Sequence, residues 1–402
     1  MKIGIIREGK VPPDSRVLFT PTQCVALQEK YNVEFIVQPS KGRCLSDELY
    51  EAAGIKLQED VSECPVLMGI KEVPKDQLIA NKTYFFFSHT IKAQPYNRAL
   101  LQKIIKENIT LLDYEVLTNE KKQRVIAFGR FAGIVGAHNG MMTYANKTKT
   151  FELKQMHKYD DYAAAIAYYK TLSFPKMKIV ITGTGRVANG AAEVLDHMGI
   201  PKVSPQDFLT QDYEEAVYTQ LGCEDYVKPK AANEKFETAD FFANPQNYQS
   251  IFAPYTKVAD LMINGIYWAN EAPAFFTKED MKQPDFGIKV IADVTCDIAP
   301  VASIPSTLFA TTIADPVFGY DPQSESAVEP YQAHTIDMMT IDNLPNELPK
   351  DASKSFGEQF TTNVIEELLA LKDTGMLERA TIAKAGKLGP HFEYLTDYVN
   401  GK

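Results

Sequence analysis

A glycine-rich turn around residue 185 is the stretch whose residue types point most directly to chemistry. The strand-like run Ile179-Val-Ile-Thr182 leads into Gly183-Thr-Gly185-Arg-Val-Ala188, and a helical pattern follows. Gly183 permits a tight turn, Gly185 lets a pyrophosphate approach bare backbone, and Ala188 is small enough for the helix to lie close to the strand. The helix N-terminus would face the phosphates. The stretch predicts a dinucleotide site, with a structural turn of another α/β protein as the alternative.

The residue that would select between the two nicotinamide dinucleotides is not evident near this turn. A carboxylate about twenty residues further on would bind the ribose 2′-hydroxyl and select NAD. Asp207 lies near that distance, but Ser204-Pro205-Gln206-Asp207 is typical of a turn or helix start. Without a clear acidic selector, we expect NADP(H) to be favoured over NAD(H). Arg186 could pair with a phosphate, and a solvated arginine is the alternative.

A second candidate site follows two other strand-like runs. One run ends in Lys71-Glu72, and the run Tyr84-Phe-Phe-Phe87 ends in Ser88-His89-Thr90-Ile91-Lys92. In an open parallel sheet, ligands bind beyond the carboxyl ends of the strands. A lysine and a histidine at one such edge could transfer protons, because histidine titrates near neutrality and a desolvated lysine can approach it. A structural histidine is the alternative, and the neighbouring lysines would suit an anionic substrate.

Several other polar residues are weaker candidates. Arg16 could bind a carboxylate, although an arginine in a loop is usually solvated. Glu115 and Arg124 flank a turn and could simply face each other as an exposed pair. Asp293 and Asp297 follow a predicted strand and could point at a nicotinamide, or they could cap the next turn. The six dispersed histidines and the lack of carboxylates at ligand spacing predict no metal site.

The elements that must position these residues alternate between strand and helix patterns in two series. Strands are predicted at 2–6, 33–37, 66–70, 84–88 and 110–112, and again at 177–182, 257–263, 289–293 and 309–313. This rhythm predicts an α/β protein with two Rossmann-like, doubly wound parallel-sheet domains separated by a cleft. We expect residues 1–131 plus 336–402 to form the substrate and catalytic domain, and residues 132–335 the dinucleotide-binding domain. The tail is expected to pack on the first domain without forming a new sheet.

Composition narrows the class of partner. The 402 residues are 45% apolar and 23% charged, with a net charge of −10, which argues against binding nucleic acid or an anionic membrane. Five scattered cysteines without a Cys-x-x-Cys pair fit reduced thiols, so we expect a cytosolic protein. No run approaches the ~20 apolar residues of a membrane span, and the N-terminal apolar run is too short for a signal peptide. Small-molecule substrates are the expected partners, and a homo-oligomer stays open.

With these positions in place, the chain closely resembles the lysine-ketoglutarate reductase family, the saccharopine dehydrogenases that form or release L-lysine. That family lies within the wider alanine dehydrogenase and transhydrogenase superfamily, and the resemblance covers nearly the whole chain. The blocks that carry it are Lys82-Thr-Tyr-Phe-Phe-Phe-Ser-His-Thr-Ile-Lys-Ala-Gln94, Ala127-Phe-Gly-Arg-Phe-Ala-Gly133, Thr182-Gly-Thr-Gly185, Ile263-Asn-Gly-Ile-Tyr-Trp268 and Ile341-Asp-Asn-Leu-Pro-Asn-Glu-Leu-Pro349.

The resemblance implies roles for individual residues. It implies that Lys71 and His89 are the acid and base. It implies that the substrate is surrounded by Arg16, Lys92, Glu115 and Arg124. It implies that the dinucleotide is bordered by Gly183, Gly185, Arg186 and Val187, with Asp293, Thr295, Asp297 and Asp342 near the domain cleft. Residues 202–209 depart from the family pattern, which leaves the adenosine ribose contacts open.

The resemblance also implies an activity, the reductive condensation of L-lysine with 2-oxoglutarate to saccharopine, or its reverse, with a nicotinamide cofactor. Animal and plant members use NADPH and free-standing fungal members use NAD, and the blocks above look closer to the NADPH type. Two alternatives stay open. One is an alanine dehydrogenase-like enzyme acting on ammonia and pyruvate, and the other is a catalytically silent, nucleotide-binding regulatory protein.

Overall fold

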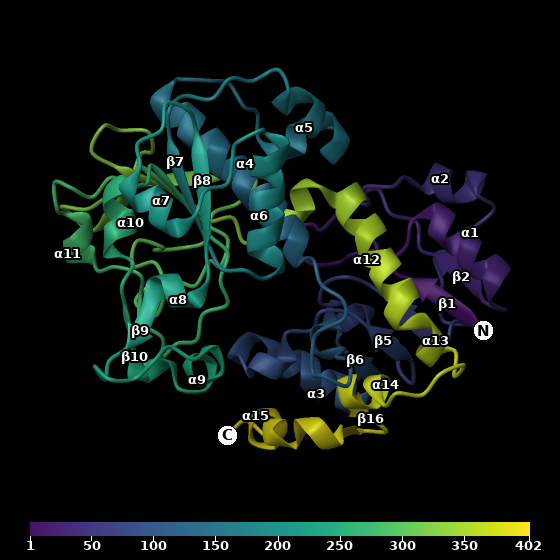
Figure 1. The fold of residues 1–402 in the computed structure, drawn as a ribbon. Helices are drawn as coiled ribbons and strands as arrows, with labels where there is room; N and C mark the ends of the chain where they lie inside the picture. The colour runs from purple at the N-terminus through teal and green to yellow at the C-terminus, as the bar shows by residue number, and fades with distance from the viewer. The chain divides into compact units, whose positions relative to one another are not determined.

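The computed structural model describes all residues from 1 to 402, and the chain divides into two compact units. The first unit comprises residues 1–128 and 349–402, and the second comprises residues 129–348. The chain therefore leaves the first unit once and returns to it once. Both units are built on a mainly parallel sheet with helices, which confirms the predicted α/β class (Figure 1).

The first unit contains an eight-stranded sheet in the order β17-β16-β6-β5-β4-β1-β2-β3. Its strands are β1 (Lys2–Ile5), β2 (Glu34–Val37), β3 (Lys56–Leu57), β4 (Val66–Met68), β5 (Thr83–Phe85), β6 (Thr110–Leu112), β16 (Thr381–Lys384) and β17 (Lys387–Leu388). The six neighbouring strands β6, β5, β4, β1, β2 and β3 are all parallel, so their carboxyl ends lie along one edge of the sheet. The five strands predicted in this part of the chain are present, and β3 was missed because it is only two residues long.

The tail forms no new sheet, but it adds two strands to the sheet of the first unit. Residues 381–388 form a hairpin that joins the sheet antiparallel to β6, with a shift of register between Thr381 and Ala383. Residues 381–383 are buried. This run is too short to give a periodic hydrophobic pattern, so the sequence did not predict the strand. The helices of this unit are α1 (Pro21–Lys30), α2 (Asp47–Ala52), α3 (Arg98–Lys106), α12 (Pro349–Asn363), α13 (Ile365–Leu368), α14 (Met376–Ala380) and α15 (Thr396–Val399).

The second unit contains a seven-stranded sheet in the order β14-β13-β15-β12-β11-β7-β8. Its strands are β7 (Lys178–Thr182), β8 (Val217–Leu221), β11 (Leu261–Asn264), β12 (Val290–Asp293), β13 (Val317–Asp321), β14 (Ser326–Val328) and β15 (Ile336–Met339), and a separate hairpin pairs β9 (Val227–Pro229) with β10 (Tyr248–Ser250). Strands β8, β7, β11, β12 and β15 are parallel, and β13 and β14 extend the sheet antiparallel.

One prediction for this sheet is wrong. Residues 309–313 are not a strand, because only Thr311 forms a bridge, to Ile341. The helices are α4 (Gly129–Thr148), α5 (Tyr162–Tyr169), α6 (Arg186–His197), α7 (Pro205–Thr210), α8 (Cys223–Tyr226), α9 (Thr238–Ala243), α10 (Ala253–Val258) and α11 (Lys278–Met281). No helix combines the length and apolar composition needed to cross a bilayer.

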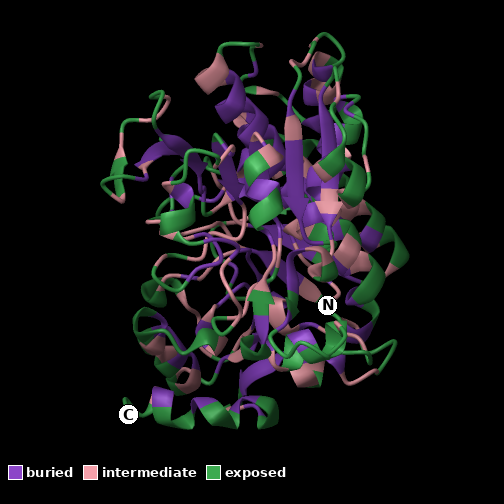
Figure 2. Cartoon of the chain, turned by 60° about the vertical axis from the view of Figure 1, so that its left-hand side comes forward, coloured by how far each residue is buried: buried purple, intermediate pink, exposed green.

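Glycines bring helices α4 and α6 into close contact, side by side in Figure 1. A Cβ on Gly133 would lie 1.8 Å from the backbone oxygen of Val187, and a Cβ on Gly190 would lie 2.2 Å from that of Arg130. Only glycine fits at either position, so the start of α6 is held against α4. Figure 2 shows the central strands as buried, whereas many helix residues are exposed. The helix that follows the glycine-rich turn therefore has a fixed position in its unit.

Candidate active site

Four strand ends of the first sheet bring together the polar residues of the predicted catalytic site. Glu8 follows β1, Lys71 and Glu72 follow β4, His89 follows β5, and Glu115 follows β6. Because β1, β4, β5 and β6 are adjacent and parallel, their carboxyl ends open on the same edge. Residues more than one hundred positions apart in the sequence are therefore gathered at one place in this unit.

His89 is held by the carboxylate of Glu72. Its Nδ1 lies 2.5 Å from Oε1 of Glu72, and the other carboxylate oxygen lies 2.8 Å from Nζ of Lys10. The imidazole ring also stacks on the ring of Phe87, with centroids 6.4 Å apart. Burial alone would raise the pKa of Glu72, but its hydrogen bonds with His89 and Lys10 outweigh burial and lower that pKa to about 2. Glu72 is thus a fixed anion that orients His89 and leaves Nε2 outside this hydrogen bond.

Lys71 is a mostly buried amine in a cationic setting. Burial lowers the pKa of Lys71, and the nearby charge of Arg16 lowers it further, whereas Asp14 opposes the shift. The backbone N–H groups of Ile70 and Lys71 donate to the carboxylate of Glu8 at 2.6 and 2.8 Å, which fixes the turn from which the lysine projects. Burial raises the pKa of Glu8 to about 8, although these two hydrogen bonds lower it. A lowered pKa makes the neutral, proton-accepting form of Lys71 easier to reach.

Two arginines of the predicted substrate site rest on aromatic rings. Arg16 is buried and makes a two-point contact with Asp14, at 2.9 Å from Nε and 2.6 Å from Nη2, and its guanidinium lies 4.2 Å above the ring of Phe128. Arg124 lies 5.3 Å from the centre of the Phe87 ring and donates from Nε to a backbone oxygen at 2.9 Å. These contacts fix the planes of both guanidinium groups, as recognition of a carboxylate requires.

Lys92 and Glu115 form the remaining pair, with Nζ and Oε1 3.9 Å apart. The predicted turn near Asn119 is a hairpin, with Val125 donating to Leu117 and a bridge between Thr118 and Arg124. From the start of this hairpin, the Glu115 carboxylate contacts Lys92, which lies in a different segment of the chain. The second carboxylate oxygen of Glu115 is buried and has no hydrogen-bond partner, so it can accept a donor from a ligand.

Three supporting residues were missed by the sequence reading. Glu72 was seen only as the neighbour of Lys71, and Glu8 and Asp14 were not selected at all. A weak signal existed, because Glu8 comes two residues after a predicted strand and Asp14 stands two residues before Arg16. Their roles depend on contacts between strand ends, which sequence spacing does not reveal.

The glycine-rich turn of the second unit has the geometry that a dinucleotide needs. Gly183 has a φ of 97°, which favours glycine, and a Cβ there would lie 3.0 Å from the backbone oxygen of Gly265. Nothing lies within 4 Å of where a Cβ of Gly185 would be. Gly185 is the N-cap of α6, so the free N–H groups of this twelve-residue helix begin beside that open space. Arg186 is exposed and Val187 is half-buried at the start of the helix.

A buried network behind the turn links three strand ends. Thr182 donates to Asn264 at 2.8 Å, Asn264 donates to Asp293 at 2.9 Å, and Thr307 donates to the other oxygen of Asp293 at 2.6 Å. The N–H of Cys296 also approaches Asp293, at 3.3 Å. Asp293 is fully buried, and burial raises its pKa to about 6 although these hydrogen bonds lower it.

Of the two readings for Asp293, the structure favours the cap of the next turn, because both carboxylate oxygens accept hydrogen bonds inside the unit and one of them accepts from the N–H of Cys296. Thr295 directs its hydroxyl to the backbone oxygens of Asn264 and Ile266, at 3.5 and 3.4 Å, so it also supports the turn. Asp297 is half-buried and Asp342 is exposed.

The second parallel strand of this unit lies further along the chain than expected. It is β8, whereas Asp207 lies in α7 and bonds to the cap residue Ser204. After β8, Asp225 accepts the N–H of Gly222 at 2.8 Å, and the carboxylate of Glu224 folds over Gly222, 2.6 Å from where a Cβ would be. An exposed carboxylate therefore stands at the end of the strand next to the glycine-rich turn.

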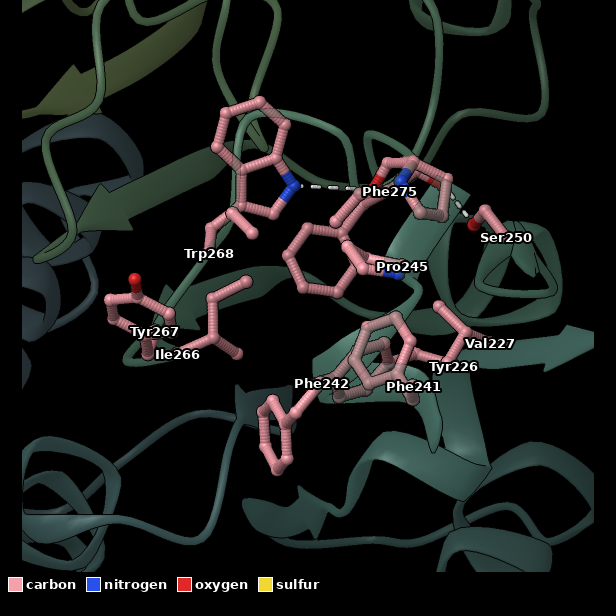
Figure 3. Close-up of a pocket in the computed structure, with 13 residues that line it drawn as sticks. Tyr226, Val227, Phe241, Phe242, Pro245, Ser250, Ile266, Tyr267, Trp268 and Phe275 are labelled. Atoms are coloured by element: carbon pink, nitrogen blue, oxygen red, sulfur yellow. Dashed lines mark hydrogen bonds between the residues drawn. The ribbon is translucent and has the colours of Figure 1, made fainter. Parts of the chain in front are cut away.

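An apolar pocket lies beyond the ends of β8 and β11. It is formed by the segment from Tyr226 to Ser250 and by the loop from Ile266 to Phe275, whose aromatic side chains face each other in Figure 3. Trp268 donates to the backbone oxygen of Pro273 at 3.4 Å, and Tyr226 and Phe275 pack edge to face with ring centres 5.1 Å apart. The space it encloses is about 30 Å³, close to the volume of one water molecule, so the aromatic side chains fill most of it.

Residues 4–135 match the family model described as the alanine dehydrogenase/PNT N-terminal domain. The chain is 30% identical to alpha-aminoadipic semialdehyde synthase of Arabidopsis thaliana over 98% of its own length, and it spans 41% of that relative. It is 27% identical to saccharopine dehydrogenase (NAD(+), L-lysine-forming) of Emericella nidulans, with 92% of each chain covered. A solved L-alanine dehydrogenase shares the fold, with a TM-score of 0.62 at 13% identity over 99% of this chain and all of the other.

The raised pKa of Asp293 predicts a pH-dependent stability of the second unit. The carboxyl keeps its proton up to about pH 6 in the folded state and up to about 3.8 when unfolded, so folding binds a proton between these values. This contribution to stability is present at pH 4 and is lost as the pH rises through 6. We expect the free energy of unfolding of the wild type, minus that of Asp293→Asn, to fall by on the order of 3 kcal/mol between pH 4 and 6.5.

Trp268 is the single tryptophan and lies in the second unit, so its fluorescence during urea unfolding reports on that unit. Asp315→Asn, at an exposed position in the same unit, is the matched control and should leave the pH dependence unchanged. A difference between wild type and Asp293→Asn that stays constant over this pH range would contradict the prediction.

Proposed function

Because this chain belongs to the family of saccharopine dehydrogenases and aminoadipic semialdehyde synthases, within the alanine dehydrogenase/PNT superfamily, we propose that it condenses L-lysine reductively with 2-oxoglutarate, or runs the reverse reaction. The product of condensation is saccharopine, and the reducing equivalent comes from a nicotinamide dinucleotide. The observation that carries the proposal is the pairing of a lysine of lowered pKa with a carboxylate-held histidine, among cationic groups, at one sheet edge.

Each chemical stage of this reaction needs a proton to be moved, and the first unit offers a group for it. The attacking ε-amine of the substrate must lose a proton, and Lys71 can accept it because burial makes the neutral form of Lys71 accessible. The hydroxyl that leaves the carbinolamine as water needs an acid, and the Nε2 of His89 can serve while Glu72 stabilises the imidazolium. Arg16, Arg124 and Lys92 would hold the substrate carboxylates, and Glu115 would accept from a substrate ammonium.

The second unit supplies residues that fit a dinucleotide. The bound group would provide the hydride that reduces the imine. Gly183 and Gly185 would let its pyrophosphate approach the backbone, and the start of α6, with Arg186 and Val187, would border it.

We propose NAD(H) as the preferred cofactor. The expectation of NADP(H) depended on the lack of a selector near Asp207, and the relevant strand is β8, which ends beside Glu224. A carboxylate there accepts hydrogen bonds from the ribose hydroxyls and repels a 2′-phosphate. The Emericella relative is named for NAD(+), so NADP(H) has no support from it. A cytosolic location stays a prediction, and the five cysteines are free thiols in the structure.

The function is tested by following absorbance at the nicotinamide band with the purified chain and a panel of substrates. We expect NADH oxidation with L-lysine plus 2-oxoglutarate, and much slower oxidation with ammonium plus pyruvate. Each pair is run with NADH and NADPH. Faster turnover of ammonium and pyruvate would replace the proposal with an alanine dehydrogenase activity, and dinucleotide binding without turnover of any pair would favour a regulatory protein.

Replacing Lys71 with Met should lower kcat by roughly 10² or more, because general acid and base groups contribute about 10²–10⁴. The affinity for NADH should change little, since the glycine-rich turn belongs to the other unit. Quenching of Trp268 fluorescence by NADH measures that affinity. Lys75→Met, an exposed lysine four residues further on, is the control and should retain full turnover. A Lys71→Met chain with nearly normal kcat would remove Lys71 from the mechanism.

Replacing Glu224 with Ser should move the cofactor preference toward NADPH. We expect the ratio of the Kd for NADPH to that for NADH to fall at least about ten-fold, because a hydrogen bond to a charged group contributes about 1.5–3 kcal/mol. Glu214→Ser, an exposed glutamate before the same strand, should leave the ratio as it is. If the wild type bound NADPH as tightly as NADH, Glu224 would not be the selector.

A further inference from the structure

The segment from Pro390 to Val399 is anchored to the first unit by apolar contacts. It comprises the 3-10 helix η8 (Pro390–Leu395) and α15, and its residues Phe392, Leu395 and Tyr398 belong to the buried cluster beside the sheet. On helix α3, Gln102 donates to the backbone oxygen of Val399 at 2.6 Å, and the guanidinium of Arg98 lies 5.2 Å from the ring of Tyr398. One face of the segment is therefore fixed against the core.

Two tyrosine hydroxyls of this segment reach the loop that carries the proposed catalytic histidine. Tyr394 donates to the backbone oxygen of Ile91 at 3.1 Å, and Tyr398 donates to that of Gln94 at 2.6 Å. The two acceptors flank Lys92, on the 3-10 helix η2 (Thr90–Lys92) that begins directly after His89. These bonds join parts of the chain about three hundred positions apart, as their sequence separations of 303 and 304 show.

The loop needs such support because its backbone is strained at two places. His89 has a φ of 53° and Ala93 a φ of 50°, both in the left-handed region that disfavours residues with a Cβ. Such conformations persist only where the surroundings hold them. At the start of the loop, Asp113 accepts from the N–H and the hydroxyl of Ser88 at 2.8 and 2.6 Å. At its end, the tyrosine hydroxyls of the 390–399 segment supply the side-chain contacts.

We propose that Tyr394 and Tyr398 are positioning residues, which hold the 89–94 loop so that His89 and Lys92 keep their places toward the substrate. The inference rests on the proposed function for the identity of the substrate, and on the hydrogen bonds alone for the position of the loop. Neither tyrosine transfers a proton in this role. Each acts through the backbone of the loop, and Lys92 is the residue whose position depends on both bonds.

The test compares the wild type with the double variant Tyr394→Phe, Tyr398→Phe, which removes two hydroxyls and keeps both rings. Hydrogen–deuterium exchange of peptides covering 89–97 reports on the loop, where the N–H groups of Lys92, Ala93 and Asn97 are bonded within the loop itself. We expect exchange there to be about five-fold faster or more, the factor that one hydrogen bond represents. Peptides from α1 should exchange at the wild-type rate. Tyr96→Phe, an exposed tyrosine of the same region, is the control.

A kinetic measurement separates positioning from simple stability. In the double variant we expect the KM for 2-oxoglutarate to rise about five-fold, with the Kd for NADH and the thermal unfolding temperature unchanged. Unchanged exchange at 89–97, or equal acceleration throughout the first unit, would overturn the inference. If the wild type turned over no substrate pair, the proposed function would fail, and the exchange rates would still decide whether the tyrosines hold the loop.

Discussion

The hydrogen bond between Glu72 and His89 joins the ends of two neighbouring parallel strands, and the chemistry proposed for the first unit depends on it. It can form only because β4 and β5 lie side by side with their carboxyl ends at one edge. His89 reaches the carboxylate from a left-handed backbone conformation, so the loop around it must be held from both sides. Lys10 neutralises the second oxygen of Glu72, which lets a partly buried anion persist at the site.

Burial acts in opposite directions on the acidic and basic groups around this bond. It lowers the pKa of Lys71, which makes the neutral amine accessible, and it raises the pKa of Glu8 and of Asp113. Glu72 differs from those two acids because a cation and an imidazole reach its carboxylate. The same sheet edge therefore holds one fixed anion and one amine that can give up its charge, which is the combination that acid and base catalysis requires.

The second unit uses the same principle for a different purpose. Its strand ends are tied by the buried chain of Thr182, Asn264 and Asp293, which leaves no oxygen of Asp293 for a ligand but fixes the base of the glycine-rich turn. The glycines of α4 and α6 let these two helices pack closely, which fixes the position of α6, the helix whose N-terminus would face a pyrophosphate. In one unit the strand ends present charged side chains, and in the other they present bare backbone.

The sequence alone determined the local features of both units. Strand, turn and helix around Gly183, and the runs ending in Lys71 and His89, were visible because each depends on residues close together in the chain. Only the tertiary structure decided the partners: Glu72 for His89, Asp14 for Arg16, and the tyrosines of the 390–399 segment for the loop. It also placed the strand beside the glycine-rich turn at β8, after helix α7, and not near Asp207. These features arise from contacts between distant segments, and no spacing in the sequence encodes a distance across a sheet edge.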